Sequence, residues 1–182
     1  MSSINSAAPE IPLSRIYTAP GIIIGSVLAW ISWAVAGAHH YVQPESLIPS
    51  MAALMILTAS VWLVMVVVRN VAVIRGLASV RYFADYKSDL PTDDRLERPA
   101  RTFNNLMQVP TLFYVVCILM LVTKSTDNVQ VILAWTFVVL RWFHAAIYMA
   151  LNWVPYRFAV WAASCIVLGV IWFRFAGQTS FG

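Results

Sequence analysis

Five long apolar segments constrain this chain more than any other feature of its sequence. They cover about residues 20–38, 48–74, 102–123, 129–151 and 155–176. Each is close to or above the roughly 20 apolar residues that a helix needs to cross the hydrocarbon core of a bilayer. The chain is 60% hydrophobic and only 11% charged, a composition that excludes an ordinary soluble domain. The sequence therefore predicts an all-α integral membrane protein, a bundle of transmembrane helices.

The positive charges in the connections predict how these helices are oriented. The connection 75–101 carries six Lys and Arg residues, whereas 39–47 carries none and 124–128 only Lys124. Lys and Arg collect in cytoplasmic loops. We therefore expect a bacterial cytoplasmic (inner) membrane protein with the 75–101 connection and the N-terminus in the cytoplasm and the C-terminus outside. The same rule explains the net charge of +4 without a nucleic-acid partner.

Two stripes of polar residues lie inside the apolar segments. Arg101, Asn105 and Gln108 are spaced i, i+4 and i+7, and a second set is spaced i, i+3, i+7 and i+11, so each set is expected to line one helix face. The second set is Arg141, His144, Tyr148 and Asn152. An arginine at membrane depth costs about 2.5 to 3.5 kcal/mol on insertion scales, so such residues indicate a functional site by default.

Arg141 is the strongest single indication of a site, because it lies near the middle of the segment 129–151 and cannot easily reach either membrane surface. One interpretation is a structural arginine that bonds neighbouring helices and locks the bundle. The other is an anion site in a polar cavity, with the remaining polar residues of the two stripes at similar depth. Arg157, in the first turn of the last segment, would join Arg101 and Arg141 in a cationic funnel suited to carboxylates or a thiolate.

The same sequence argues against several kinds of catalysis. After Glu97 the only carboxylate side chain is that of Asp127, so paired-carboxylate chemistry and metal-dependent hydrolysis are not expected. Cys117 and Cys165 lie in apolar runs without the spacing of a metal site, and no metal is predicted. Serine, threonine and lysine residues show no nucleophile-and-base pattern, so we expect any nucleophile to be brought by a ligand.

The two stripes resemble a known family. The segment 101–110, Arg-Thr-Phe-Asn-Asn-Leu-Met-Gln-Val-Pro, is similar to the Arg-x-x-x-Asn-x-x-Glu signature of the membrane-associated proteins in eicosanoid and glutathione metabolism, the MAPEG family. The sequence Arg-Trp-Phe-His at 141–144, followed by Tyr148 and Arg157, resembles the third helix and the start of the fourth in microsomal glutathione transferases and prostaglandin E synthase. The resemblance covers about residues 48–180.

The resemblance implies a four-helix bundle over 48–182 that assembles as a homotrimer and binds glutathione between adjacent subunits. Residues 1–47 then form an added part, a tail and an extra transmembrane helix. The resemblance also implies that Arg157, with help from Arg141, holds the glutathione thiol as a thiolate. The residues that it assigns to binding the rest of glutathione are Arg101, Asn105, Gln108, His144 and Tyr148.

The chain departs from the family pattern at three positions. The signature glutamate is Gln108, and Phe158 and Trp161 replace a serine and a tyrosine of the prostaglandin synthase type. Two functions are therefore predicted, and they leave open whether the chain is an enzyme. The first is a glutathione transferase or peroxidase that conjugates or reduces a lipophilic substrate entering from the membrane lipids. The alternative is a non-catalytic relative, an accessory subunit that docks to a larger membrane complex through the helix 20–38.

Overall fold

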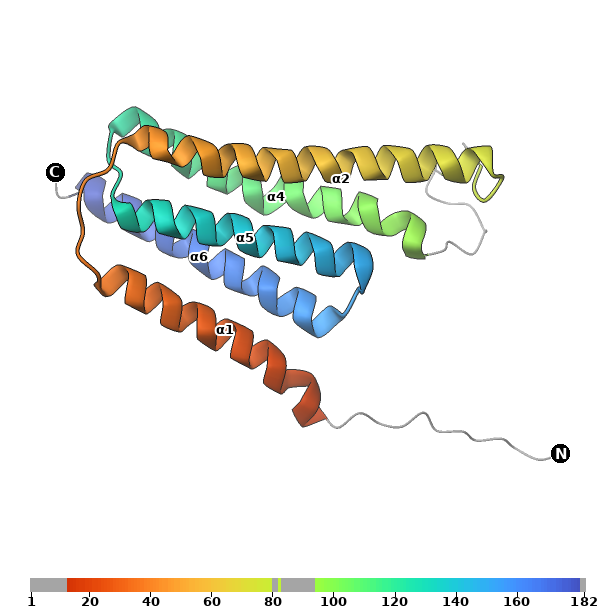
Figure 1. Cartoon of the computed structure of the whole chain (residues 1–182), viewed down its shortest axis with the longest axis horizontal. Coiled ribbons are helices and arrows are strands. Elements are labelled where there is room, and N and C mark those ends of the chain that lie inside the picture. Colours follow the sequence, from red (N-terminus) through yellow and green to blue (C-terminus); the bar gives the residue numbers. More distant parts are fainter. Residues whose placement is uncertain (1–12, 80–81, 83–93, 181–182) are drawn as a thin grey trace.

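The computed structural model describes residues 13–79, 82 and 94–180, which form a bundle of helices. In chain order its elements are α1 (Leu13–Ala36), the short 3-10 helix η1 (Pro44–Leu47), α2 (Ile48–Ile74), α4 (Asp94–Thr123), α5 (Asn128–Ala150) and α6 (Val154–Ser180). Within these described ranges, five α-helices run along the long axis of the molecule, and each is long and apolar enough to cross a membrane (Figure 1). The predicted all-α membrane bundle is confirmed.

Several helices extend beyond the apolar segments that predict them. α1 and α4 each begin earlier than the apolar run, and α6 continues to Ser180. Hydropathy marks the part of a helix inside the hydrocarbon, whereas the hydrogen-bonded backbone continues until a residue interrupts it. Thr92, Asp93 and Asp94 are residue types that cap helices; Asp94 is the first residue of α4, whereas Thr92 and Asp93 lie outside the described residues. Pro155 is the second residue of α6, where its missing N–H group costs nothing.

The end of α5 corrects one sequence prediction. The spacing of the second polar stripe predicts Asn152 on the same helix face as Arg141, but α5 ends at Ala150 and Asn152 lies beyond it. The Asn152 backbone has a positive φ of 49°, and its N–H donates to the Ile147 carbonyl at 2.8 Å. Asparagine tolerates this left-handed conformation better than most residues. The turn places Asn152 next to the start of α6.

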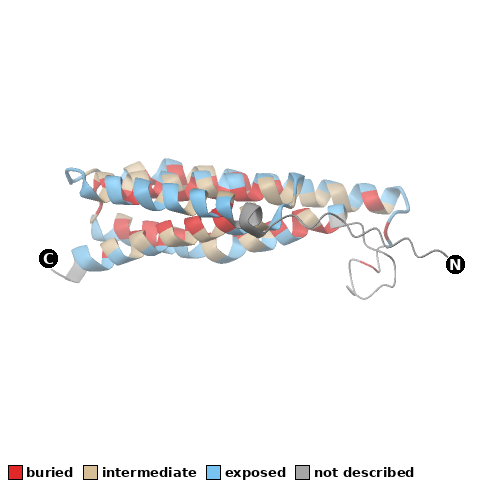
Figure 2. Ribbon diagram, turned by 90° about the horizontal axis from the view of Figure 1, so that it is seen from below, coloured by how far each residue is buried: buried red, intermediate tan, exposed pale blue. Residues whose placement is uncertain are grey.

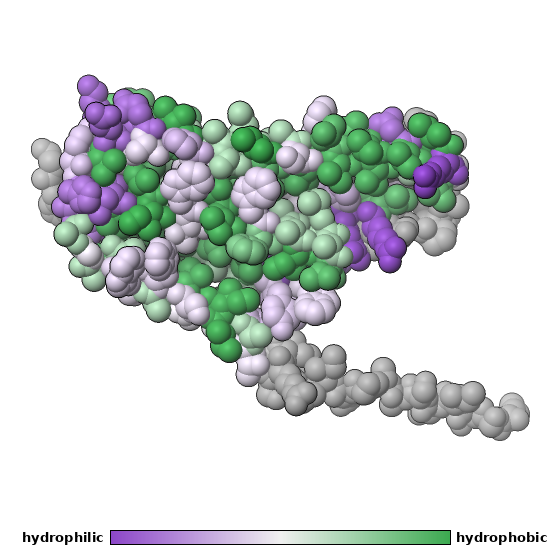
Figure 3. Space-filling view, in the orientation of Figure 1, coloured by the Kyte–Doolittle hydropathy of each residue, from purple (hydrophilic) through white to green (hydrophobic). Residues whose placement is uncertain are grey.

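The core joins the helices through tightly packed apolar side chains. Phe113 of α4 and Phe137 of α5 are fully buried and stack with their ring centroids 4.8 Å apart. Leu54 and Val61 of α2 and Ile171 of α6 belong to the same cluster. Buried residues follow the inner faces of the helices (Figure 2), and the face of the molecule seen in Figure 3 is mostly apolar along the middle, with hydrophilic residues towards its two ends. In lipid, such packing and interhelical hydrogen bonds hold a bundle together.

A polar cluster around Asp127 ties the start of α5 to the end of α6. Asp127 is the N-cap of α5, and its Oδ1 accepts a hydrogen bond from the Gln130 N–H at 2.8 Å. Its Oδ2 accepts from Arg174 Nη2 in a partly buried ion pair, and from Gln178 Nε2 at 2.9 Å. The carboxylate thus satisfies donors from both helices.

Removing this carboxylate is expected to destabilise the bundle. We expect Asp127→Ala to lower the free energy of unfolding by about 1 to 3 kcal/mol, because the buried donors that it satisfies lose their partner. The change is measured as a shift of the unfolding midpoint in detergent. Glu45→Ala at the same end of the bundle is the control, since Glu45 is exposed; a midpoint that moves equally in both variants would contradict the assignment.

The first helix is fastened to the rest of the bundle. α1 packs against α6 and also contacts α5 (Figure 1). The Trp30 indole N–H donates to Thr136 Oγ1 of α5 at 3.1 Å. Beyond the end of α1, the Asn128 side chain accepts from the His40 N–H at 3.1 Å and donates to the Ala38 carbonyl at 3.0 Å. α1 is therefore attached to the bundle through its C-terminal half, where Ile31 and Ala34 are buried.

Candidate functional site

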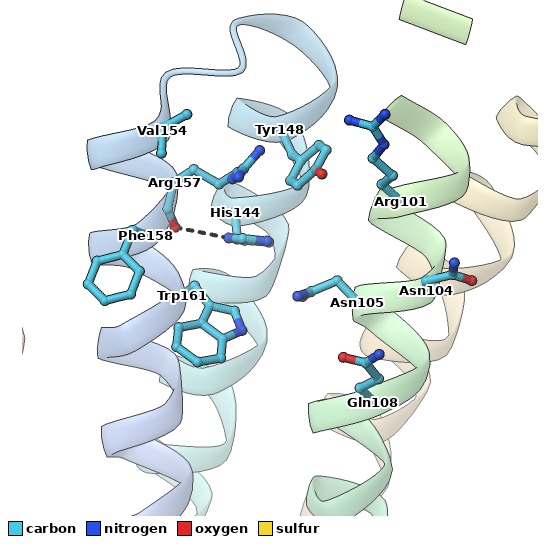
Figure 4. Close-up of a pocket in the computed structure, with 10 residues that line it drawn as sticks. All are labelled: Arg101, Asn104, Asn105, Gln108, His144, Tyr148, Val154, Arg157, Phe158 and Trp161. Carbon is cyan, nitrogen blue, oxygen red and sulfur yellow. Dashed lines mark hydrogen bonds between the residues drawn. The ribbon is translucent and has the colours of Figure 1, made fainter. Parts of the chain in front are cut away.

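A pocket of about 550 Å³ opens between α4 on one side and α5 and α6 on the other. It lies towards the end of the bundle where α4 and α6 begin, which we call the arginine-rich end after Arg75, Arg98 and Arg157. The lining consists of Arg101, Asn104, Asn105, Gln108, His144, Tyr148, Val154, Arg157, Phe158 and Trp161. Polar side chains from α4 face those of α5 and α6 across the pocket (Figure 4). Of the seven sequence-predicted site residues, six are in the lining and the seventh, Arg141, is not.

Arg141 of α5 lies behind the pocket, and its side chain connects α5 to α4 and α6. Its side chain is fully buried in α5, and its Nη1 donates to Asn105 Oδ1 of α4 at 2.9 Å. Its Nη2 lies 3.8 Å from Cys165 Sγ of α6, a weak hydrogen bond, and its guanidinium carbon lies 5.1 Å from the Phe137 ring centroid. Arg141 thus reaches the pocket through Asn105, whose amide it holds in the lining.

Two contacts hold the guanidinium of Arg157. Its Nη1 donates to Asn152 Oδ1 at 2.6 Å, and its central carbon lies 4.0 Å from the centroid of the Tyr148 ring. The second distance is that of a cation–π contact. Asn152 accepts from only one of the five N–H groups that a guanidinium carries. The turn between α5 and α6 therefore fixes a charged donor group on the pocket wall.

The hydrogen bond of His144 determines which of its ring nitrogens carries the proton. His144 is only 3% exposed, and its Nδ1 lies 3.1 Å from the main-chain carbonyl oxygen of Arg157 (Figure 4). A carbonyl only accepts, so Nδ1 is the donor and the neutral ring keeps its acceptor lone pair on Nε2. Nε2 is buried and has no hydrogen-bond partner among the described residues. A buried acceptor without a partner is suited to a donor group on a ligand.

The pocket has a positive electrostatic character. Arg101 and Arg157 belong to its lining, Arg141 lies directly behind it, and the lining includes no carboxylate among the residues that the structure describes. Glu97, one turn before Arg101 on α4, is buried and accepts a hydrogen bond from the Tyr82 hydroxyl at 3.0 Å. Guanidinium groups bind carboxylates through short, charge-assisted hydrogen bonds. The arrangement is therefore suited to a ligand that carries carboxylate or thiolate groups.

Besides the apolar lining residue Val154, sequence reasoning missed two residues of this site. Asn104 lines the pocket, and Cys165 contacts the buried Arg141. Helical spacing contained a signal for both, because Asn104 follows Arg101 at i+3 and Cys165 follows Trp161 at i+4. Either residue could have been added to a stripe by extending it to the next helical neighbour.

The comparisons with known proteins give one finding. A sequence model of the MAPEG family matches residues 50–177, which is more than half of the chain. Every lining residue of the pocket falls inside this match, whereas α1 and η1 lie before it. No curated protein and no solved structure matches the chain.

Proposed function

The chain belongs to the MAPEG family, and from this premise we propose that it is a membrane transferase that binds glutathione between adjacent subunits, in a site to which each copy contributes the pocket between α4, α5 and α6. The observation that carries the proposal is the pocket lining, which gathers Arg101 and Arg157 with amide, imidazole and phenol groups. Glutathione has two carboxylates and a thiol, whose negative charges complement these cations. The Nε2 acceptor of His144 complements an N–H group of the same peptide.

The residues of the site have separate roles in this proposal. Arg157 stabilises negative charge on the glutathione sulfur, because a thiol with no cation nearby stays mostly protonated at neutral pH. Arg141 is a positioning residue that holds the Asn105 amide by a hydrogen bond. The residues that bind the rest of the peptide are Arg101, Asn105, Gln108, His144 and Tyr148. Gln108 offers a neutral amide where the family signature has an acid, so the ammonium group of glutathione is bound by hydrogen bonds instead of an ion pair.

The open cationic pocket favours a transferase over an accessory subunit. A bundle with a purely structural role has no need of several guanidinium groups around a cavity at membrane depth. The part that we propose as the catalytic unit is 48–182, to which 1–47 adds the helix α1. α1 uses one face to pack on α6 of its own chain, which gives it a role within the bundle.

We also propose a homotrimer in a bacterial cytoplasmic (inner) membrane, with the pocket opening towards the cytoplasm and the C-terminal end of α6 outside. The positive charges at the arginine-rich end support this orientation. The side chains of Asn104 and Gln108 are exposed in one copy of the chain although they lie within the membrane-spanning part of α4. Neighbouring copies would shield these amides from the lipid, where polar groups are unfavourable.

Calorimetry of glutathione binding to the purified protein in detergent tests the proposed function. We expect saturable binding that Arg101→Ala weakens about tenfold or more, because a hydrogen bond to a charged group contributes about 1.5 to 3 kcal/mol. Arg75→Ala is the matched control, since Arg75 is exposed at the end of α2 and outside the lining. No binding at millimolar glutathione, or equal binding by wild type and Arg101→Ala, would contradict the proposal.

A further inference from the structure

The turn between α5 and α6 contains a residue in the left-handed conformation, Asn152, with a φ of 49°. Its N–H donates to the Ile147 carbonyl at 2.8 Å, and the Leu151 N–H donates to the same carbonyl at 3.0 Å. These main-chain hydrogen bonds end α5 before α6 begins at Val154. Asparagine is one of the few residues with a Cβ atom that adopts this conformation routinely. The backbone of the turn therefore fixes the point from which the Asn152 side chain starts.

The Asn152 side chain contacts the guanidinium of Arg157. Its Oδ1 accepts a hydrogen bond from Arg157 Nη1 at 2.6 Å, a short distance that is typical of a hydrogen bond to a charged group. Two main-chain contacts hold the same arginine. The Arg157 N–H donates to the Trp153 carbonyl at 2.9 Å, and the Arg157 carbonyl oxygen lies 3.1 Å from His144 Nδ1. Both the backbone and the side chain of Arg157 are therefore held in place.

The Tyr148 ring provides a second contact for the guanidinium. Its centroid lies 4.0 Å from the central carbon of Arg157, whereas Asn152 bonds one of the terminal nitrogens. The last turn of α5 and the residue after it thus contact the group at two different points. Figure 4 shows the Arg157 side chain extending from α6 towards Tyr148. A free arginine side chain has many rotamers, and these two contacts together select one of them.

The neutral charge of Asn152 is as important as its position. Aspartate also adopts the left-handed conformation and has the same Oδ1 acceptor, but its carboxylate would compensate the charge of Arg157. An amide oxygen holds the guanidinium and leaves its positive charge uncompensated at this contact. Asn152 is not part of the pocket lining, so it affects a ligand in the pocket through Arg157.

We propose that Asn152 is a positioning residue, whose neutral oxygen holds the Arg157 guanidinium over the Tyr148 ring with its full charge available to the thiolate. This inference rests on the proposed function and adds to it a residue outside the pocket. A cation that is already in position does not have to move when charge develops on the sulfur. Loss of the Asn152 contact should therefore slow the reaction of bound glutathione and have little effect on how tightly glutathione binds.

Asn152→Gly removes the acceptor and keeps the turn, because glycine adopts the left-handed conformation without strain. We expect kcat for the reaction of glutathione with chlorodinitrobenzene, a general electrophile, to fall about tenfold to 100-fold, the effect of a displacement of about 1 Å. KM for glutathione should stay close to that of wild type, because the contacts with the rest of the peptide remain. Lys124→Gly is the matched control and should have full activity. Lys124 is the other described non-glycine residue with a positive φ, and it lies in the turn between α4 and α5.

Asn152→Asp separates the charge of the contact from its geometry. Aspartate keeps the turn and the hydrogen bond, but its carboxylate compensates the charge of Arg157. The bound thiol should then ionise at a higher pH than in wild type. The ultraviolet absorbance of the thiolate, recorded against pH with saturating glutathione, measures this shift. Wild-type kcat in Asn152→Gly, or a wild-type titration in Asn152→Asp, would overturn the inference and leave the proposed function intact.

Nuclear magnetic resonance of protein with isotope-labelled arginine tests the positioning without glutathione. The Tyr148 ring current shifts the signal of a guanidinium held against it, and Arg157→Lys identifies the Arg157 signal by its loss. We expect Asn152→Gly to move this signal to the range of the exposed Arg75, as Tyr148→Leu should. An Arg157 signal that stays in place in Asn152→Gly would overturn the inference, whether or not glutathione binds. A moved signal, together with no glutathione binding by wild type, would refute the proposed function and retain Asn152 as the residue that holds Arg157.

Discussion

Replacing Arg157 with alanine is expected to lower kcat/KM for glutathione conjugation by about 100- to 1,000-fold, the effect of removing one group that stabilises developing negative charge. The Arg157 guanidinium is fixed by Asn152 and Tyr148 on the pocket wall, so nothing has to reorganise when the sulfur becomes charged. Without this cation the thiol stays protonated and attacks slowly. Steady-state kinetics of glutathione addition to a lipophilic electrophile measures the loss.

Two further variants show whether the loss belongs to the guanidinium. Arg157→Lys keeps the charge but not the planar donor group, so we expect it to recover part of the rate. Arg75→Ala removes an exposed arginine outside the pocket lining and should have full activity. Light scattering should give the same number of subunits for all three variants. A folded Arg157→Ala oligomer with wild-type activity would refute the role of Arg157 in activating the thiol.

The second large effect is expected at Arg141. Arg141→Ala should lower the free energy of unfolding by about 2 to 5 kcal/mol, the usual cost of truncating a large buried side chain. Arg141 is fully buried and has contacts with α4 and α6 through Asn105 and Cys165, so its loss leaves a cavity at the junction of three helices. Unfolding of the detergent-solubilised protein by increasing fractions of denaturing detergent measures the change.

Packing and positioning by Arg141 can be separated with a second pair of variants. Arg141→Met keeps most of the side-chain length and fills the cavity, so we expect much of the stability to return. Methionine cannot donate a hydrogen bond to Asn105 Oδ1, so we expect Arg141→Met to bind glutathione more weakly than wild type. The loss should equal that of Asn105→Ala, which removes the acceptor of the same hydrogen bond. If Arg141→Met binds glutathione as wild type does, Arg141 has only a packing role.

Most of the fold could be predicted because it depends on one physical quantity, the length of each run of apolar residues. A helix that crosses lipid needs a long run of apolar residues, and such runs are visible in the sequence without any knowledge of tertiary contacts. The helix ends were less accurate, because the helical backbone of α1, α4 and α6 continues past the apolar run. The Asp127–Arg174 ion pair had no sequence signal either, since its partners are 47 residues apart and only the packing of α5 on α6 brings them together.

The candidate site could be predicted wherever it follows helical spacing. Arg101, Asn105 and Gln108 of α4 do reach one pocket, because residues spaced by whole turns share a helix face. Asn152 does not share the helix face of the second stripe. α5 ends before it, in a turn where the Asn152 backbone has a left-handed conformation. The sequence could not predict which ring nitrogen of His144 carries the proton. That depends on a main-chain carbonyl in the next helix, which only the α5–α6 turn brings to the ring.

The addition of α1 changes the parity of the membrane crossings. Without α1, the four helices α2, α4, α5 and α6 start and finish at the same surface, the one that contains the α4–α5 turn. With α1 the number of crossings is odd, and the chain enters its first helix at the surface where the pocket opens (Figure 1). A reporter fused before α1 would therefore share a compartment with the pocket mouth, while one fused after α6 would be in the opposite compartment. We therefore expect the segments before α1 and after α6 to lie in different aqueous compartments.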